Sequence, residues 1–125
     1  MNQLTVKKVE FYGEETACVT LESGISMIQV FCHPCEYQEG DKVENLLRVL
    51  DAEVKAAYLS DWSAEVKRDK SRERIEQTGP YSYVGCGTVV DRENGIIQVN
   101  GFCIEIGDLP TEDPVEFEIN RLDLW

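Results

Sequence analysis

Two runs rich in β-branched and aromatic residues lie on either side of Asn94-Gly95, and they constrain the fold more than any other feature of the chain. The runs cover residues 81–90 and 96–106. Asn-Gly between two such runs is the strongest short-range signal for a β-hairpin with a two-residue turn. We therefore expect the last third of the chain to be β-structure.

The register of this hairpin gives each glycine of the first run a large cross-strand neighbour. With a two-residue turn, Gly85 lies opposite Ile104 and Gly87 lies opposite Phe102. Large side chains over glycines protect weak positions of a strand. Glycines also permit the sharp bends that small barrels require.

Further strands are expected at residues 4–11, 16–22, 25–31 and 114–125. Apolar and polar residues alternate in the last of these, while the first has the broken alternation typical of a first strand. A turn at Ser23-Gly24 would join the second and third of these in a hairpin with Val19 opposite Ile28 and Leu21 opposite Ser26. The expected inward residues are Ala17, Val19, Leu21, Ile28 and Val30 in the hairpin and Val115, Phe117 and Ile119 in the last strand.

Residues 42–60 have two interpretations. Apolar residues recur there at helical spacing: Val43, Leu46, Leu47, Leu50, Val54, Ala57 and Tyr58. Asp41 with Glu44 three residues later resembles a capping box at a helix start. A Gly-Asp-x-Val turn also launches strands in small barrels. We favour the helix.

The resulting order, three strands, a helix and two or three strands, resembles the OB-fold, a five-stranded Greek-key barrel with a helix between its third and fourth strands. We expect one domain over residues 1–125. Its fold would be mainly β with one or two helices, forming a small, OB-like, partly open antiparallel barrel. This resemblance lies in element order, and a barrel fold does not determine function.

Charge narrows the class of partner. The 125 residues include 24 Asp and Glu against 12 Lys and Arg, a formal net charge of -12. Such a surface repels nucleic acid and anionic membranes and favours a basic protein partner. The first hypothesis is an acidic interaction module: an adaptor, an antagonist or immunity factor, or a nucleic-acid mimic. Its candidate partner-binding residues are Glu112, Asp113, Glu116 and Glu118.

The segment 60–78 holds the exception to this acidity. Five basic residues gather there: Lys67, Arg68, Lys70, Arg72 and Arg74. Acidic residues interleave with them, so we expect a solvated helix or a mobile loop. An alternative hypothesis is that these five side chains bind single-stranded nucleic acid. Aromatic side chains would then supply stacking surfaces, the candidates being Tyr12, Phe31, Tyr37, Trp62, Tyr81 and Tyr83.

One short motif, Cys32-His33-Pro34-Cys35, has residues that could bind a metal or take part in a reaction. A Cys-x-x-Cys pair can bind zinc or cycle as a redox dithiol. A structural zinc site needs four ligands, and the expected hairpin register places Cys86 opposite Cys103 as a second pair. A small zinc protein is therefore a further alternative. Otherwise these thiols are small buried apolar groups.

Other motifs are missing from the sequence. The first residues do not have the pattern of a signal peptide, and no apolar run is long enough to span a bilayer. We therefore expect a cytoplasmic protein with reduced cysteines and no membrane partner. No catalytic constellation is evident, so the sequence favours a non-enzymatic role without a cofactor. An open strand edge could pair with a second copy to form a homodimer.

Overall fold

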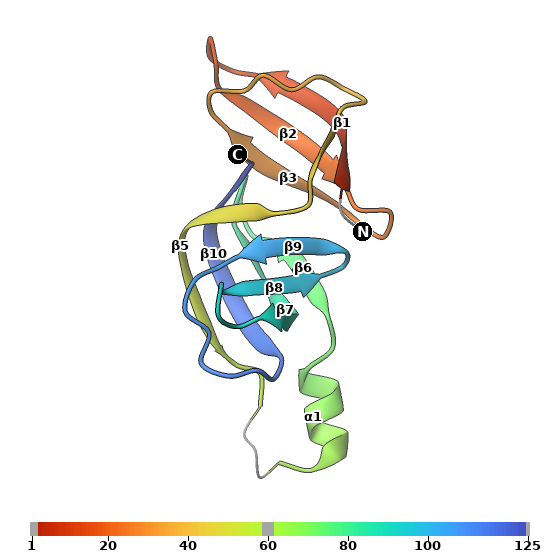
Figure 1. Ribbon diagram of the computed structural model, residues 1–125, viewed down its shortest axis with the longest axis vertical. Coiled ribbons are helices and arrows are strands. Elements are labelled where there is room, and N and C mark those ends of the chain that lie inside the picture. The colour runs from red at the N-terminus through yellow and green to blue at the C-terminus, as the bar shows by residue number, and fades with distance from the viewer. Residues whose placement is uncertain (1–2, 59–61, 125) are drawn as a thin grey trace.

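The computed structural model describes residues 3–58 and 62–124, which form ten strands and one short helix (Figure 1). The predominance of β-structure confirms the expected fold class. The elements in chain order are β1 (Gln3–Phe11), β2 (Ala17–Glu22), β3 (Met27–Cys32), β4 (Lys42–Glu44), β5 (Leu47–Ala56), α1 (Ala64–Lys70), β6 (Arg74–Gln77), β7 (Tyr83–Asp91), β8 (Ile96–Val99), β9 (Phe102–Glu105) and β10 (Val115–Leu124).

Strands β5, β10, β7, β8 and β9 form a closed barrel. The first four strands pair antiparallel in that order, and β8 continues antiparallel to β9. A short parallel pairing, with Leu47 against Ile104, joins β9 back to β5 and completes the ring. The small OB-like barrel is thus confirmed, although it is closed rather than partly open.

A second, antiparallel sheet in the order β4-β1-β2-β3 lies beside the barrel, at the top in Figure 1, and is called the upper sheet below. It is attached through a parallel pairing of β3 with the end of β10, where Asp123 lies opposite Phe31 and Leu124 opposite Cys32. Buried residues of this sheet and of the barrel form one hydrophobic cluster. β10 therefore belongs to both halves of the molecule.

The ladder between β5 and β10 is interrupted midway. Asp51 adopts the left-handed conformation with φ of 64°, and the Asn120 side-chain amide donates a hydrogen bond of 2.8 Å to its carboxylate. Before this point Ile119 is buried, and after it Leu122 is buried. The interruption thus changes the face that β10 buries as it passes from the barrel into the second sheet.

The helix favoured for residues 42–60 is wrong. Residues 42–44 and 47–56 are strands β4 and β5, as the alternative turn interpretation predicted, and residues 59 and 60 lie outside the described residues. Strand pairing overrides the helical spacing, because Leu47 is buried in the barrel while Leu50 is 54% exposed. The helix in the described chain is α1, between β5 and β6, in the charged segment. Ser63 begins it, accepting a hydrogen bond from the Val66 backbone N–H.

The expected register around Asn94-Gly95 is also wrong. Val89 pairs with Ile97, and the strand expected over 96–106 is divided by a turn at Asn100-Gly101 into β8 and β9. Both turn residues have positive φ, 49° and 85°, which a continuous strand does not allow. Each of the two glycines still has a large cross-strand neighbour, but on another strand. On β10, Phe117 lies opposite Gly85 and Val115 lies opposite Gly87.

The earlier hairpin and the last strand agree better with expectation. Leu21 pairs with Ile28 and Val19 with Val30, two positions from the expected register, because the connection is longer than two residues. A shift of two preserves the face of each side chain. The residues expected to point inward are all buried: Ala17, Val19, Leu21, Ile28, Val30, Val115, Phe117 and Ile119.

Candidate functional site

A groove of about 310 Å³ lies on the barrel, where β5, β10, β7 and β6 are neighbours. It contains two of the acidic residues proposed for partner binding, Glu116 and Glu118. Its lining residues are Glu53, Val54, Lys55, Arg74, Val84, Gly85, Glu116, Phe117 and Glu118. Charged side chains thus surround a floor that is partly apolar.

Strand register places one face of these four strands in two rows of residues across the sheet. Most of these residues line the groove, whereas Cys86 is buried and Glu76 lies beside the groove. The first row, from β5 to β6, is Lys55, Glu116, Cys86 and Arg74. The second row is Glu53, Glu118, Val84 and Glu76. Directly paired residues of antiparallel strands share a face and lie close enough to interact.

The first row is neutralised by cations of the chain itself. The Glu116 carboxylate lies 3.4 Å from the Lys55 ammonium and 3.9 Å from the Arg74 guanidinium. Its side chain is only 27% exposed. Glu116 therefore offers little free negative charge to a partner.

The second row carries unbalanced negative charge. Glu53 and Glu118 are exposed and directly opposite each other, and within residues 3–58 and 62–124 neither forms an ion pair. Glu76, exposed at the far end of the row, also lacks one among these residues. Like charges directly opposite each other destabilise a sheet. The half-buried Val84 between Glu118 and Glu76 provides an apolar surface beside the carboxylates.

The other two acidic candidates lie elsewhere. Glu112 and Asp113 are exposed in the loop before β10, where the Asp113 backbone N–H donates a hydrogen bond to the Thr111 hydroxyl. Neither residue lines the groove. The structure therefore brings together only Glu116 and Glu118 of the four. Sequence analysis missed Glu53 because residues 42–60 were interpreted as a helix.

The basic candidates are dispersed along α1, the turn after it and β6. The Lys67 ammonium lies 5.3 Å from the centre of the Tyr58 ring, and Arg72 lies 3.6 Å from Asp69. Arg68 is exposed on α1, and Arg74 reaches Glu116 in the groove. The side chain of Lys70 lies outside the described part of the chain. Nucleic-acid binding by this segment stays a prediction.

The cysteines do not have the arrangement that the zinc hypothesis assumed. Cys86 is paired with Arg74 and Glu116 of its neighbouring strands, whereas Cys103 is paired with Gln98, so the two are not cross-strand partners. Among the described residues no three His, Cys, Asp or Glu side chains are grouped to hold a metal ion. Zinc binding stays a prediction, now without the register that suggested it.

Cys32 and Cys35 do lie together, and both are buried. Burial, and next the hydrogen bond between the two thiols, raises the pKa of Cys32 well above its ordinary value. A thiol with a raised pKa is a poor nucleophile at neutral pH, because the thiolate is the reactive form. This environment does not favour the redox interpretation of the motif.

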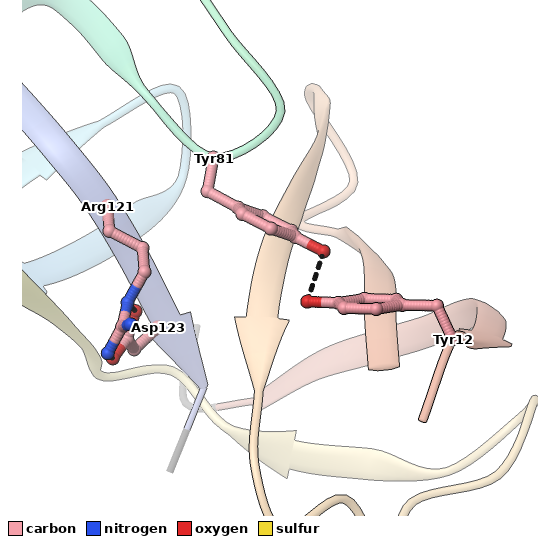
Figure 2. Close-up of polar contacts among 4 residues, drawn as sticks. All are labelled: Tyr12, Tyr81, Arg121 and Asp123. Carbon is pink, nitrogen blue, oxygen red and sulfur yellow. Dashed lines mark hydrogen bonds and ion pairs between the residues drawn. The ribbon is translucent and has the colours of Figure 1, made fainter. Parts of the chain in front are cut away.

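A second cluster lies on the outer face of the upper sheet, near the C-terminal end of β10 (Figure 2). Arg121 donates two hydrogen bonds, of 2.8 and 2.9 Å, to the Asp123 carboxylate, and its guanidinium lies 4.1 Å from the centre of the Phe31 ring. Tyr81 packs edge-on against Phe31, and its hydroxyl lies 3.0 Å from that of Tyr12. Sequence analysis named the three aromatic residues singly and missed their proximity.

This cluster connects the two halves of the molecule. Tyr81 comes from the β6–β7 connection, Tyr12 follows β1, and Arg121 belongs to β10. Its charged groups satisfy each other, so it presents less free charge than the groove. We therefore regard the groove as the candidate binding site and this cluster as a structural contact.

Comparison of the chain with protein-family models, with curated proteins and with solved structures finds no match. Among the described residues, no helix has the length and apolar character needed to cross a membrane. The groove is therefore the feature of the molecule that indicates a function.

Proposed function

We propose that this protein is an acidic interaction module that binds a basic segment of another protein through its barrel groove. The opposed carboxylates of Glu53 and Glu118 carry this proposal, since no cation of the described chain neutralises them. A net charge of -12 adds long-range attraction for a basic partner. Adaptor, antagonist or immunity factor, and nucleic-acid mimic are all roles that would use such a surface.

Arginine is the side chain that fits this groove best. Its planar guanidinium can donate hydrogen bonds to two carboxylates at once, whereas lysine presents a point charge. The methylene groups of an arginine would lie on Val84 while the guanidinium meets Glu118. Arg74 already forms an ion pair with Glu116, at 3.9 Å, within the same groove.

We place this function in the cytoplasm. All five cysteines of the chain are free, including the adjacent pair Cys32 and Cys35. A reducing compartment keeps thiols in this state. The partner would accordingly be a cytoplasmic protein with an exposed basic segment.

The test is binding of a capped heptapeptide in which arginine alternates with valine, measured by calorimetry at low and moderate salt. We expect the double variant E53Q/E118Q to bind about tenfold more weakly, a change of about 1.4 kcal/mol. The matched control is E112Q/D113N, which removes the same two charges outside the groove. Salt should weaken binding to the unsubstituted chain, because it screens exposed charges.

Two results would contradict the proposal. Equal weakening in both double variants would show that net charge, rather than the groove, attracts the peptide. Failure of the unsubstituted chain to bind the peptide at low salt would exclude the groove as a site for basic segments. Binding of single-stranded DNA that is lost on neutralising Arg68 and Arg72 would instead support the nucleic-acid alternative.

A further inference from the structure

Strand β6 lies beside the groove and forms an edge of the sheet. Among the described residues its one strand partner is β7, and Arg74, Glu76 and Gln77 are exposed. Edge strands present backbone groups that can pair with another chain. Addition of an extended segment to such an edge is a common mode of peptide recognition.

The hydrogen-bond phase of β6 shows which of its backbone groups point outward. The Thr78 N–H donates a hydrogen bond of 2.9 Å to the Ser82 carbonyl, in the same register that pairs Gln77 with Tyr83. Hydrogen-bonded and non-hydrogen-bonded pairs alternate along an antiparallel ladder. The N–H and C=O groups of Ile75 and Gln77 therefore point away from β7, and no backbone partner for them occurs among the described residues.

Charge indicates what kind of segment would pair there. A strand added to β6 extends both rows of outward side chains by one position. The residue opposite Glu76 would face an exposed carboxylate that forms no ion pair within the described residues, so a cationic side chain is favoured. The residue opposite Arg74 would favour a polar or acidic side chain.

A second copy of the chain is a poorer occupant of this edge. The antiparallel register that uses both Ile75 and Gln77 would place Glu76 directly against its own counterpart, and like charges in that position repel. Each copy also carries a net charge of -12. A basic segment has neither disadvantage.

We infer that the basic partner binds as an extended strand added to the free edge of β6, with a basic side chain opposite Glu76. This inference rests on the proposed function and adds the edge of β6, beside the groove, to the surface that the basic partner contacts. Main-chain hydrogen bonds to Ile75 and Gln77 would hold the segment, and Glu76 would select a basic side chain. The partner is therefore expected to have an unstructured or extended basic stretch rather than a basic helix.

The experiment uses a capped peptide, Val-Ser-Val-Arg-Val-Ser-Val, which can place arginine opposite Glu76 and serine opposite Arg74 in either strand direction. Two further versions of this parent peptide are N-methylated at alternate residues: one on the odd-numbered residues and one on the even-numbered residues. Only alternate residues of an added strand direct their N–H groups at β6. One methylated peptide should therefore bind about tenfold more weakly than the parent, and the other should bind nearly as well. All three peptides have the same charge and sequence.

A protein variant provides the complementary test. Gln77→Pro removes an outward N–H that the β7 ladder does not use, so the edge strand should tolerate it. Gln77→Ala is the control, because it removes the same side chain and keeps the N–H. We expect weaker peptide binding to Gln77→Pro alone. If Gln77→Pro fails to fold, the methylated peptides decide the question without it.

The possible outcomes separate this inference from the proposed function. Equal binding of all three peptides would mean attraction by charge without strand addition, which overturns the inference and leaves the proposed function standing. No binding of the parent peptide would overturn the inference, and no binding of the arginine-valine peptide would overturn the proposed function. A dimer seen by sedimentation and lost in Gln77→Pro would show that a second copy occupies the edge, which also overturns the inference.

Discussion

Glu118 of β10 lies directly opposite Glu53 of β5, and neither carboxylate is paired with a cation in the described part of the chain. Two residues along the same two strands, Lys55 and Glu116 form an ion pair. The sheet thus holds an attractive pair and a repulsive pair side by side.

Glu118→Gln is predicted to stabilise the fold. Removing the repulsion with Glu53 should raise the free energy of unfolding by roughly 0.2–1 kcal/mol. Glu116→Gln should instead lower it slightly, because the exposed cations Lys55 and Arg74 lose their half-buried partner. Urea denaturation of both variants checks this, and changes of the same sign would contradict it.

Gly85→Ala is predicted to destabilise the barrel. A Cβ at this position would lie 2.0 Å from the Arg74 carbonyl oxygen and 2.8 Å from Phe117 Cζ. Overpacking of this kind costs about 1–3 kcal/mol. In Gly13→Ala, the control, the nearest atom would be 3.5 Å away. Thermal melting should show a large fall in melting temperature for Gly85→Ala and little change for Gly13→Ala. Equal melting temperatures for the two variants would refute the prediction.

Asn45→Ala should lower the free energy of unfolding more than an Asn→Ala substitution at an exposed position does. The buried Asn45 side chain donates to the Gly101 carbonyl at 2.8 Å and accepts from the Cys103 N–H at 2.9 Å. Each buried polar group left unpaired costs about 1–3 kcal/mol. In the exposed comparison, Asn94→Ala, water replaces the lost contacts. Chemical denaturation measures both, and similar losses would mean that the Asn45 bridge contributes little.

Arg121→Lys tests the geometry shown in Figure 2. Lysine keeps the charge but cannot form both parallel hydrogen bonds to Asp123 while stacking on Phe31. We expect a loss of about 1–2 kcal/mol in unfolding free energy. Arg72→Lys, whose contact with Asp69 is exposed, should be nearly neutral. A neutral Arg121→Lys would show that charge alone maintains this contact.

Because the Cys32 thiol is buried, we expect the free energy of unfolding to fall at alkaline pH. Burial raises the pKa of Cys32 in the folded state, whereas an unfolded thiol titrates near pH 8.5. Above that pH the unfolded chain releases a proton that the folded chain retains, so stability falls as pH rises. Below pH 8.5 the thiol is protonated in both states, so the stability that the raised pKa of Cys32 provides is fully present. Cys32→Ala should flatten the decline between pH 8.5 and 10, and an unchanged pH profile would contradict this.

Alternation of apolar and polar residues was a reliable guide wherever one face of a strand is buried. It identified the inward residues of β2, β3 and the first part of β10, because a shift of two in register leaves each side chain on its face. It failed where tertiary pairing decides between conformations. Leu47 and Leu50 match helical spacing, yet β5 forms because β10 and β9 pair with it on opposite edges.

Turn conformation was the second source of error. Asn94-Gly95 does lie between paired strands, but the Gly95 N–H bonds to the Arg92 carbonyl at 3.2 Å in a longer connection. Asn100-Gly101, inside the run expected as one strand, is the sharper turn. The acidic groove was only half predictable for the same reason. Glu116 and Glu118 follow from alternation in β10, while Glu53 depends on a strand that the sequence pattern did not favour.

The sharing of β10 by the barrel and the upper sheet also has a consequence for synthesis. β10 pairs with β3, β5 and β7, and all three precede it in the chain. While these strands are being translated, none of them has this neighbour, so the barrel stays open and the upper sheet stays unattached. Both halves are therefore expected to become stable together, in one late event, when residues 115–124 emerge.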